Sequence, residues 1–94
     1  MKKFFPDGFL RKLRNQVSIN IVITNFLNMD VRNKNDFLRF RCPLCGKFHT
    51  AVNPQTNLAR CFDCRQNFNT IDMVMVASAC SFIEAVNFLE DKIN

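Results

Sequence analysis

Four cysteines are the residues of this chain best suited to do chemistry. They form two Cys-x-x-Cys pairs, Cys42 with Cys45 and Cys61 with Cys64, and fifteen residues separate the pairs. Zn²⁺ prefers four tetrahedral ligands and binds thiolates at about 2.3 Å. Each pair offers two thiolates from one tight turn, and this spacing is a specific zinc signature. The sequence therefore predicts one zinc ion, and it is structural rather than catalytic because four thiolates leave no open coordination position.

Other uses of the cysteines and of the single histidine remain open. A thioredoxin-like redox site needs one Cys-x-x-Cys in a βαβ setting, whereas this chain has two pairs and no such pattern. Four structural cysteines without a metal would seldom fall into this spacing. His49 competes with Cys45 as a metal ligand, although a lone histidine in a strand is more often a surface or packing residue. Cys80, at the end of an apolar helix, is expected to be a small buried hydrophobe.

Length and composition agree with a small intracellular domain that a bound metal stabilises. The chain has 94 residues, which is one domain with a modest core, and such domains often need a metal or a disulfide. No apolar run approaches the roughly 20 residues that would span a bilayer, so we expect a cytoplasmic protein without a membrane partner. Thiols stay reduced in the cytoplasm, which favours metal ligands over disulfides. The opening Met-Lys-Lys favours a natural N-terminus.

Charge is distributed unevenly along the chain. Residues 1–60 contain eleven Lys and Arg against three acidic residues, whereas residues 61–94 contain two against five. The formal net charge of +5 is therefore the balance of a basic first part and an acidic last part. The basic part is the candidate surface for binding anions.

Helical spacing of apolar residues predicts the N-terminal elements. Residues 7–17 fit a short helix, with Asp7 as its N-cap after a proline. Residues 19–27 fit either an alternating strand or a helix that begins after Ser18, and we favour the helix. The polar residues 30–36 are expected to form a loop.

Strands are expected around the cysteine pairs. Residues 37–41, 47–52 and 57–62 alternate in the manner of strands, and residues 53–57 form the turn between the last two. These three strands would form one small antiparallel sheet. Gly46 follows the first pair, where a left-handed backbone costs glycine little, and Arg65 stands in the same place after the second pair, where more strain is expected.

Capping residues predict two C-terminal helices. Asn69 precedes an apolar helix over residues 70–79, and Asn67 and Asn69 are candidates for left-handed or capping positions. Ser81 and Glu84 have the spacing of a capping box before a second helix. The sequence thus predicts an α+β fold: a zinc ribbon with a small antiparallel sheet, around which two N-terminal and two C-terminal helices pack. One domain would cover residues 1–94, with a helical N-terminal part at 1–36, the zinc ribbon at 37–68 and the C-terminal helices at 69–94.

These motifs resemble the zinc-binding domain at the N-terminus of bacterial DnaG-type DNA primases. That family has a Cys-Pro-x-His pair, a strand that ends in Cys-Phe-x-Cys, a helix with an Ile-Asp-Phe-Val-Met-like core and a Ser-Phe-x-Glu-Ala-Val helix. The resemblance covers nearly the whole chain and supports the helical choice for residues 19–27. The matching residues are Cys42, Pro43, Cys61, Phe62, Cys64, Ile71, Asp72, Val74, Met75, Ser81, Phe82, Glu84, Ala85, Val86 and Leu89.

The chain departs from the family pattern in three places. Cys45 stands where the family usually has histidine, as in the four-cysteine fingers of phage primase-helicases. The hairpin between the cysteine pairs is shorter than in the bacterial domains. The sequence RQNFN replaces a glycine-rich turn after the last cysteine. In outline the zinc ribbon is retained.

The resemblance implies a function in DNA replication. Primase zinc domains are thought to recognise single-stranded template DNA and hold it for a catalytic core that lies elsewhere, so the implied partners are the template and a primase core, replicative polymerase or helicase. Basic residues and phenylalanines in the predicted sheet agree with such a role, because single-strand binders combine positive charge with aromatic platforms. Most of the phenylalanines at 37, 40, 48, 62 and 68 are nevertheless expected in the core. The candidate contacts to the nucleic acid are Arg39, Arg41, Lys47, His49 and Arg60.

The same residues argue against catalysis by this chain. Nucleotidyl transfer needs clustered carboxylates that hold divalent metals, and the sequence has no Asp-x-Asp motif. It also has only two glycines and no phosphate-binding glycine-rich loop. We therefore expect a non-enzymatic module. The alternative is a protein-docking zinc ribbon that recruits a replication or transcription partner without contacting DNA.

Overall fold

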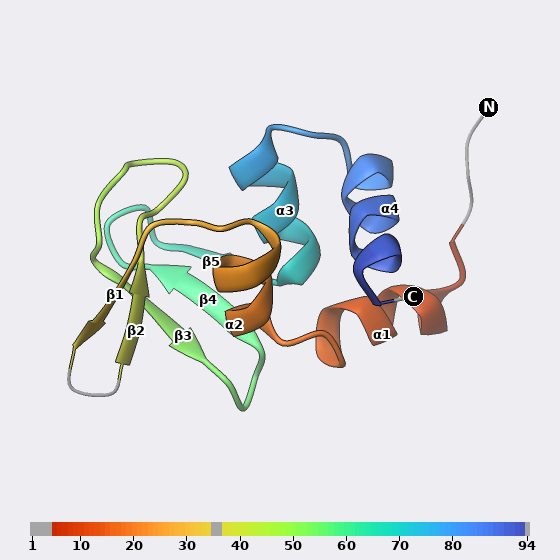
Figure 1. Ribbon diagram of the computed structural model, residues 1–94, viewed down its shortest axis with the longest axis horizontal. Coiled ribbons are helices and arrows are strands. Elements are labelled where there is room, and N and C mark those ends of the chain that lie inside the picture. The colour runs from red at the N-terminus through yellow and green to blue at the C-terminus, as the bar shows by residue number, and fades with distance from the viewer. Residues whose placement is uncertain (1–4, 35–36, 94) are drawn as a thin grey trace.

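The computed structural model describes residues 5–34 and 37–93, and it has an elongated shape with extents of 43 × 23 × 21 Å. Figure 1 shows the strands gathered at one end and three of the helices, α1, α3 and α4, at the other. The short helix α2 lies between the two ends. The architecture is α+β with a ribbon of antiparallel strands, as predicted.

The first helix, α1, spans Asp7–Asn15. Its N-cap is Pro6, so the prediction of Asp7 as the cap was wrong by one residue. Proline is tolerated at a helix start because the first amide groups have no intrahelical acceptor. Asp7 instead lies in the first turn, where a negative charge favours the helix dipole. The helix buries Leu13, and Val17 is buried just beyond its end.

The second helical segment begins as α2 at Ile19–Ile21 and continues as the π-helical turn η1 at Val22–Phe26. The helical prediction for this segment is confirmed, but the π-helical turn was not expected. The backbone N–H of Leu27 donates to Val22 O at 2.8 Å, five residues back. The run of β-branched residues here crowds the regular helix, and the hydroxyl of Thr24 bonds the carbonyl of Asn20.

Two strands form the first sheet, β1 at Val31–Lys34 and β2 at Phe37–Phe40. They pair antiparallel, with Arg32 opposite Arg39. The strand β2 was predicted, whereas the prediction of a loop over residues 30–36 was wrong for Val31–Lys34. Its polar composition masked the strand: Val31 packs against the core, whereas Arg32 and Asn33 are exposed.

Three strands form the second sheet in the order β3-β4-β5, all antiparallel: β3 at Thr50–Asn53, β4 at Leu58–Cys61 and β5 at Gln66–Phe68. The sequence predicted β3, β4 and the turn between them. It did not predict β5, where Asn67 is a strand residue rather than a left-handed one. The expected single sheet is in fact two sheets.

A buried threonine joins the two sheets. The hydroxyl of Thr50 in β3 accepts a hydrogen bond from Phe40 N at 2.9 Å and donates one to Phe40 O at 2.8 Å. Both residues are fully buried. This one side chain therefore satisfies a donor and an acceptor at the end of β2 that a continuous sheet would have paired through backbone groups.

Both C-terminal helices have the predicted caps. The helix α3 spans Thr70–Ser78, and Asn69 forms a capping box with Asp72. The helix α4 spans Phe82–Ile93, and Ser81 and Glu84 exchange the same pair of hydrogen bonds. The backbone N–H and hydroxyl of Ser81 lower the pKa of Glu84. Between the helices, Ala79 adopts a left-handed conformation at φ 52°, so it ends α3 rather than extending its apolar face.

One continuous core connects the helices to the ribbon. It includes Leu13 and Val22 from the N-terminal helices, Phe40 from the first sheet, and Phe68 and Leu89 from further along the chain. Because both ends contribute to the same core, neither buries its apolar face without the other.

Asn57, in the turn between β3 and β4, links the ribbon to the N-terminal helices. Its side-chain nitrogen donates to Arg14 O and Val17 O, each at 2.7 Å, and its oxygen accepts from Ile19 N at 2.8 Å. The residue is left-handed at φ 55°, a conformation that asparagine tolerates better than most residues. The bend between α1 and α2 is thereby held by a single amide group.

Within the part of the chain that the structure describes, no single helix is long and apolar enough to cross a membrane. The helices α3 and α4 would meet the criteria of length and composition only together, and a bend of 113° separates them.

Candidate metal centre

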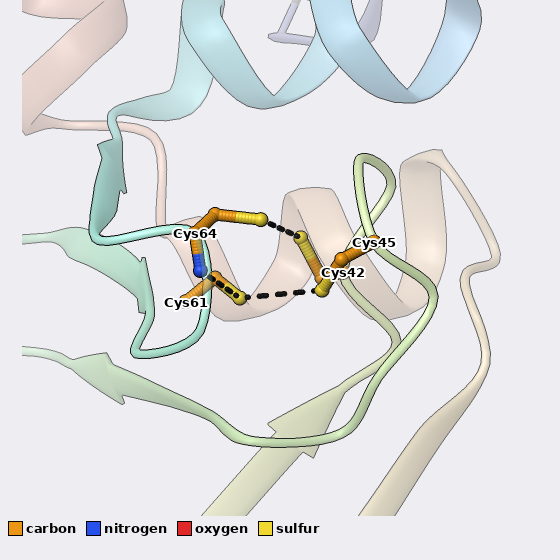
Figure 2. A group of neighbouring side chains, drawn as sticks. All are labelled: Cys42, Cys45, Cys61 and Cys64. Carbon is orange, nitrogen blue, oxygen red and sulfur yellow. Dashed lines mark hydrogen bonds between the residues drawn. The ribbon is translucent and has the colours of Figure 1, made fainter.

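The four predicted cysteine ligands meet at one point. Cys42 and Cys45 come from the loop after β2, and Cys61 and Cys64 come from the end of β4 and the turn that follows it. Their sulfur atoms all lie within 4.8 Å of one another, and Figure 2 shows the side chains of the two loops pointing toward each other. Among the described residues, 5–34 and 37–93, this is the group of side chains suited to hold a metal ion.

The sulfur positions fit the geometry of a zinc ion. A tetrahedron with metal–sulfur distances of about 2.3 Å has sulfur–sulfur edges of about 3.8 Å. Two of the four edges that join the loops have lengths of 3.8 Å, from Cys42 Sγ to Cys64 Sγ, and 3.6 Å, from Cys45 Sγ to Cys61 Sγ. These distances are far longer than the roughly 2.05 Å of a disulfide bond. Four soft thiolates in this arrangement suit one structural zinc ion and leave no position for a substrate.

Both cysteine pairs sit in the same kind of turn. Gly46 and Arg65, each following the second cysteine of its pair, have positive φ angles of 78° and 58°. The turn directs backbone N–H groups at sulfur: Leu44 N lies 3.4 Å from Cys42 Sγ, and Cys64 N lies 3.4 Å from Cys61 Sγ. Such donors stabilise negative charge on the thiolates. The expected strain at Arg65 is confirmed by its left-handed backbone.

The thiols influence one another's protonation. Burial raises the pKa of Cys42, and burial together with the neighbouring thiols raises that of Cys64 to about 12. Burial also acts to raise the pKa of Cys61, but the N–H of Cys64 and the thiols of Cys42 and Cys45 outweigh it and lower the value to about 7. Four neighbouring thiolates would repel one another strongly. A bound cation that displaces the thiol protons would remove this repulsion.

His49 does not belong to this cluster. Its Nδ1 lies 3.5 Å from an oxygen of Asp63, and its ring lies 5.2 Å from the ring of Phe62. More than half of its side chain is exposed. The ligand set of four cysteines is therefore complete without the histidine. Cys80 is also separate from the cluster: it is half-buried against the core, and its thiol donates to Val74 O at 3.7 Å.

Two guanidinium groups surround one phenylalanine near the first sheet. The guanidinium carbon of Arg32 lies 4.1 Å from the centre of the Phe48 ring, and that of Arg41 lies 5.1 Å from it. Arg41 also forms an exposed ion pair of 3.2 Å with Asp30. Arg32 was missed because its segment was predicted as a loop, although the alternation of Arg32 with Lys34 could have indicated a strand. We call Arg32, Arg41 and Phe48 the arginine cluster.

A second basic and aromatic group lies on the second sheet. The register places Ala51, Arg60 and Asn67 in one row across β3, β4 and β5. Arg60 donates to the side-chain oxygen of Asn67 at 3.1 Å, and its guanidinium carbon lies 5.8 Å from the centre of the Phe62 ring. Because Cys61 and Ala59 are buried, this row faces away from the core.

The predicted DNA contacts are thus divided between the two sheets. Arg41 belongs to the arginine cluster, and His49 and Arg60 flank Phe62 on the second sheet. Arg39 is half-buried and donates to Thr50 O at 3.2 Å, so part of its bonding capacity is used inside the ribbon. Lys47 has an exposed side chain, and its carbonyl accepts from Cys42 N in the first turn.

Most of these five phenylalanines were expected in the core, and two of the four whose side chains are described lie there. Phe40 and Phe68 are core residues, Phe48 is half-buried, and Phe62 is exposed. The side chain of Phe37 lies outside what the structure describes.

The fold and the cysteine centre agree with one known family. A comparison with protein families matches residues 5–94 to the CHC2 zinc finger, the zinc ribbon of DnaG. A comparison with curated proteins found no match.

Proposed function

The chain belongs to the CHC2 zinc-finger family of DnaG-type primases, and from this premise we propose that it is a module that binds single-stranded template DNA for a primase-like catalytic core. The zinc ion holds the two loops of the ribbon, and the surfaces around them contact the strand. Zinc here supplies rigidity, because its four cysteine ligands exclude a reacting group.

The observation that supports this proposal most is the arginine cluster. Two positive charges lie within cation–π distance of the Phe48 ring, on the same ribbon that holds the metal centre. Proteins that bind single strands combine basic side chains for the phosphates with aromatic rings for the bases. Arg39, Arg41, Lys47, His49 and Arg60 remain the proposed contacts, and Arg32 joins them.

The module acts without catalysing a reaction of its own. The chain lacks an Asp-x-Asp motif, and among the described residues the group suited to metals consists of cysteines rather than carboxylates. A primase core on another domain or polypeptide, or a replicative polymerase or helicase, would act on the strand that this module holds. The proposed setting is the cytoplasm.

A salt titration tests the proposal. Fluorescence anisotropy of a labelled single-stranded DNA should show weak binding that falls with salt, with a log-log slope of about −0.7 for each phosphate contacted. Replacing both Arg32 and Arg41 by alanine should flatten this slope by about one to two units. Zinc content should stay at one per chain, because exposed charges contribute little to stability.

The matched control replaces two exposed cations at the helical end, Arg11 and Lys12 of α1, by alanine. The net charge changes equally in both double variants. If both double variants flatten the salt slope equally, the arginine cluster contributes only nonspecific positive charge. Absence of binding to any single strand at about 50 mM salt, by zinc-loaded protein, would contradict the proposal.

The alternative of protein docking has one structural feature in its favour. Phe82 and Ile83, in the first turn of α4, have 41% and 37% of their surfaces exposed. A zinc ribbon that recruits a protein partner would use such an apolar site rather than the basic side chains. Loss of partner capture in Ile83→Ser, with no single-strand binding by the wild type, would establish this second function.

A further inference from the structure

A cleft of about 300 Å³ lies on the outward face of the second sheet. It is lined by Ala51, a small residue at the β3 end of the row, and by the large apolar residues Leu58 and Phe62. These two side chains expose 37% and 42% of their surfaces, although a large exposed apolar residue is unfavourable unless it has a use. The volume is at the lower limit of the roughly 300–1,000 Å³ of small-ligand pockets, which suits one flat ring system.

Apart from the hydroxyl of Thr56, which donates to Asn53 O at 3.5 Å, the polar side chains that line the cleft offer hydrogen-bond donors. Arg60 uses one nitrogen to bind the side-chain oxygen of Asn67, so the rest of its planar group is free to donate. The side-chain oxygen of Asn53 accepts from Gln55 N at 3.0 Å. Each amide oxygen thus already accepts one hydrogen bond, and the amide nitrogens of Asn53 and Asn67 are donors on the rim.

The apolar wall is held in a fixed orientation. The Phe62 ring lies 5.2 Å from the His49 ring, and the Arg60 guanidinium carbon lies 5.8 Å from its centre. Phe62 also lies between two metal ligands, so its backbone moves little while zinc is bound. A ring in this position is a platform for stacking, and such platforms give the main sequence-tolerant contacts to single strands.

We propose that this cleft binds one unstacked base of the template strand, and that the base is guanine. The base stacks on Phe62, and its acceptor-rich O6/N7 edge receives donors from Arg60 and the two asparagines. Guanine presents two adjacent acceptors on that edge, whereas adenine presents a donor beside its one acceptor, which would face the donors of the rim. This inference rests on the proposed function, since it names the base that the DNA-binding module selects.

The test uses twelve-nucleotide strands that are abasic except at one central position, which carries dG, dA, dC or dT. A fully abasic strand measures the phosphate contacts alone. Zinc-loaded protein should bind the dG strand at least about fivefold more tightly than the abasic strand, from stacking. It should also bind dG at least about fivefold more tightly than dA, from the edge contacts.

Two variants assign the effect to the cleft. Phe62→Leu keeps apolar bulk but removes the ring, so it should abolish the advantage of dG over the abasic strand and leave abasic binding unchanged. Arg60→Lys keeps the charge but loses the planar group, so it should abolish the preference for dG over dA. Leu44→Ala is the control, because Leu44 is a 57% exposed apolar residue in the turn of the other cysteine pair. Each variant must retain one zinc per chain.

The outcomes separate this inference from the proposed function. Equal binding of all five strands would overturn the base cleft and leave the proposed function standing. A preference for a base other than dG, or an unchanged preference in Phe62→Leu, would also overturn the inference. Absence of binding to every strand, including ordinary single-stranded DNA, would overturn both.

Discussion

Cys45 is the proposed metal ligand at which single-residue chemistry can be tested most directly. It is exposed, so it contributes little apart from its bond to the metal. Cys45→Ala should therefore lose most bound zinc and impair folding, whereas His49→Ala should retain one zinc per chain in elemental analysis. Cys45→His should also retain zinc, because three cysteines and one histidine form a normal zinc site. Zinc loss in His49→Ala with retention in Cys45→Ala would contradict the ligand assignment.

Gly46 and Arg65 allow the same backbone conformation to be tested in opposite directions. Arg65→Gly should stabilise the zinc-loaded protein by up to about 1 kcal/mol, because relief of about 1–2 kcal/mol in the folded state exceeds the entropic cost of glycine. Gly46→Ala should destabilise it by about 1–2 kcal/mol. No atom beyond Gly46 and its two chain neighbours lies within 4 Å of the added Cβ, so it is the φ of 78° that opposes the change.

The measurement for this pair is the denaturant midpoint at a fixed excess of zinc. Opposite shifts in the two variants would confirm that both turns depend on a left-handed residue. Shifts of the same sign would show that the side chain of Arg65, rather than its backbone, determines the stability of the second turn.

Among the elements, the contact between the two sheets depends on Thr50. Thr50→Val keeps the shape but leaves the buried N–H and C=O of Phe40 without partners, at a cost of roughly 1–3 kcal/mol. Thr50→Ser keeps the hydroxyl and loses one methyl group, at about 1 kcal/mol. Urea denaturation should rank valine below serine, and hydrogen exchange at the Phe40 amide should accelerate only in the valine variant. Equal exchange in both would mean that the hydroxyl does not join the sheets.

Element prediction succeeded where the signal is local and failed where it is not. Asn69 with Asp72, and Ser81 with Glu84, cap their helices through residues three positions apart, so the sequence alone indicated both helix starts. The strand β1 is polar, with only the weak alternation of Arg32 and Lys34 as a local signal, and it forms by pairing with β2.

The metal site shows the same division. The cysteine spacing predicted that the four thiols lie together, because a short spacing fixes a turn. The division of the strands into two sheets depends on a buried threonine ten residues from its partner, and the contacts of Arg32 and Arg60 with aromatic rings depend on the final packing. Such long-range choices follow from tertiary structure and carry no periodic signal in the sequence.

For the whole molecule, the shared core couples the helices to the metal. Zinc binding should supply on the order of 10 kcal/mol or more of folding free energy. A strong chelator should therefore abolish the helical circular dichroism signal together with the zinc, in one transition and at one chelator concentration. Return of zinc should restore both. Helices that persist after complete zinc loss, with an unchanged thermal midpoint, would show that the metal is incidental to the fold.

The hydrogen bonds of Asn57 also affect how the chain folds during its synthesis. The N-terminal helices are synthesised before the side chains that hold them in place. Asn57, which holds their bend, lies 38 residues after Ile19. Thr70, whose hydroxyl bonds Leu13 O, lies 57 residues after Leu13. At translation rates of about 5–20 residues per second, the first of these delays lasts roughly 2–8 s. The contacts of α1 with α3 and α4 form later still, because residues 70–93 are the last of these elements to be synthesised. The docking of the N-terminal helices is therefore the step at which synthesis and folding compete.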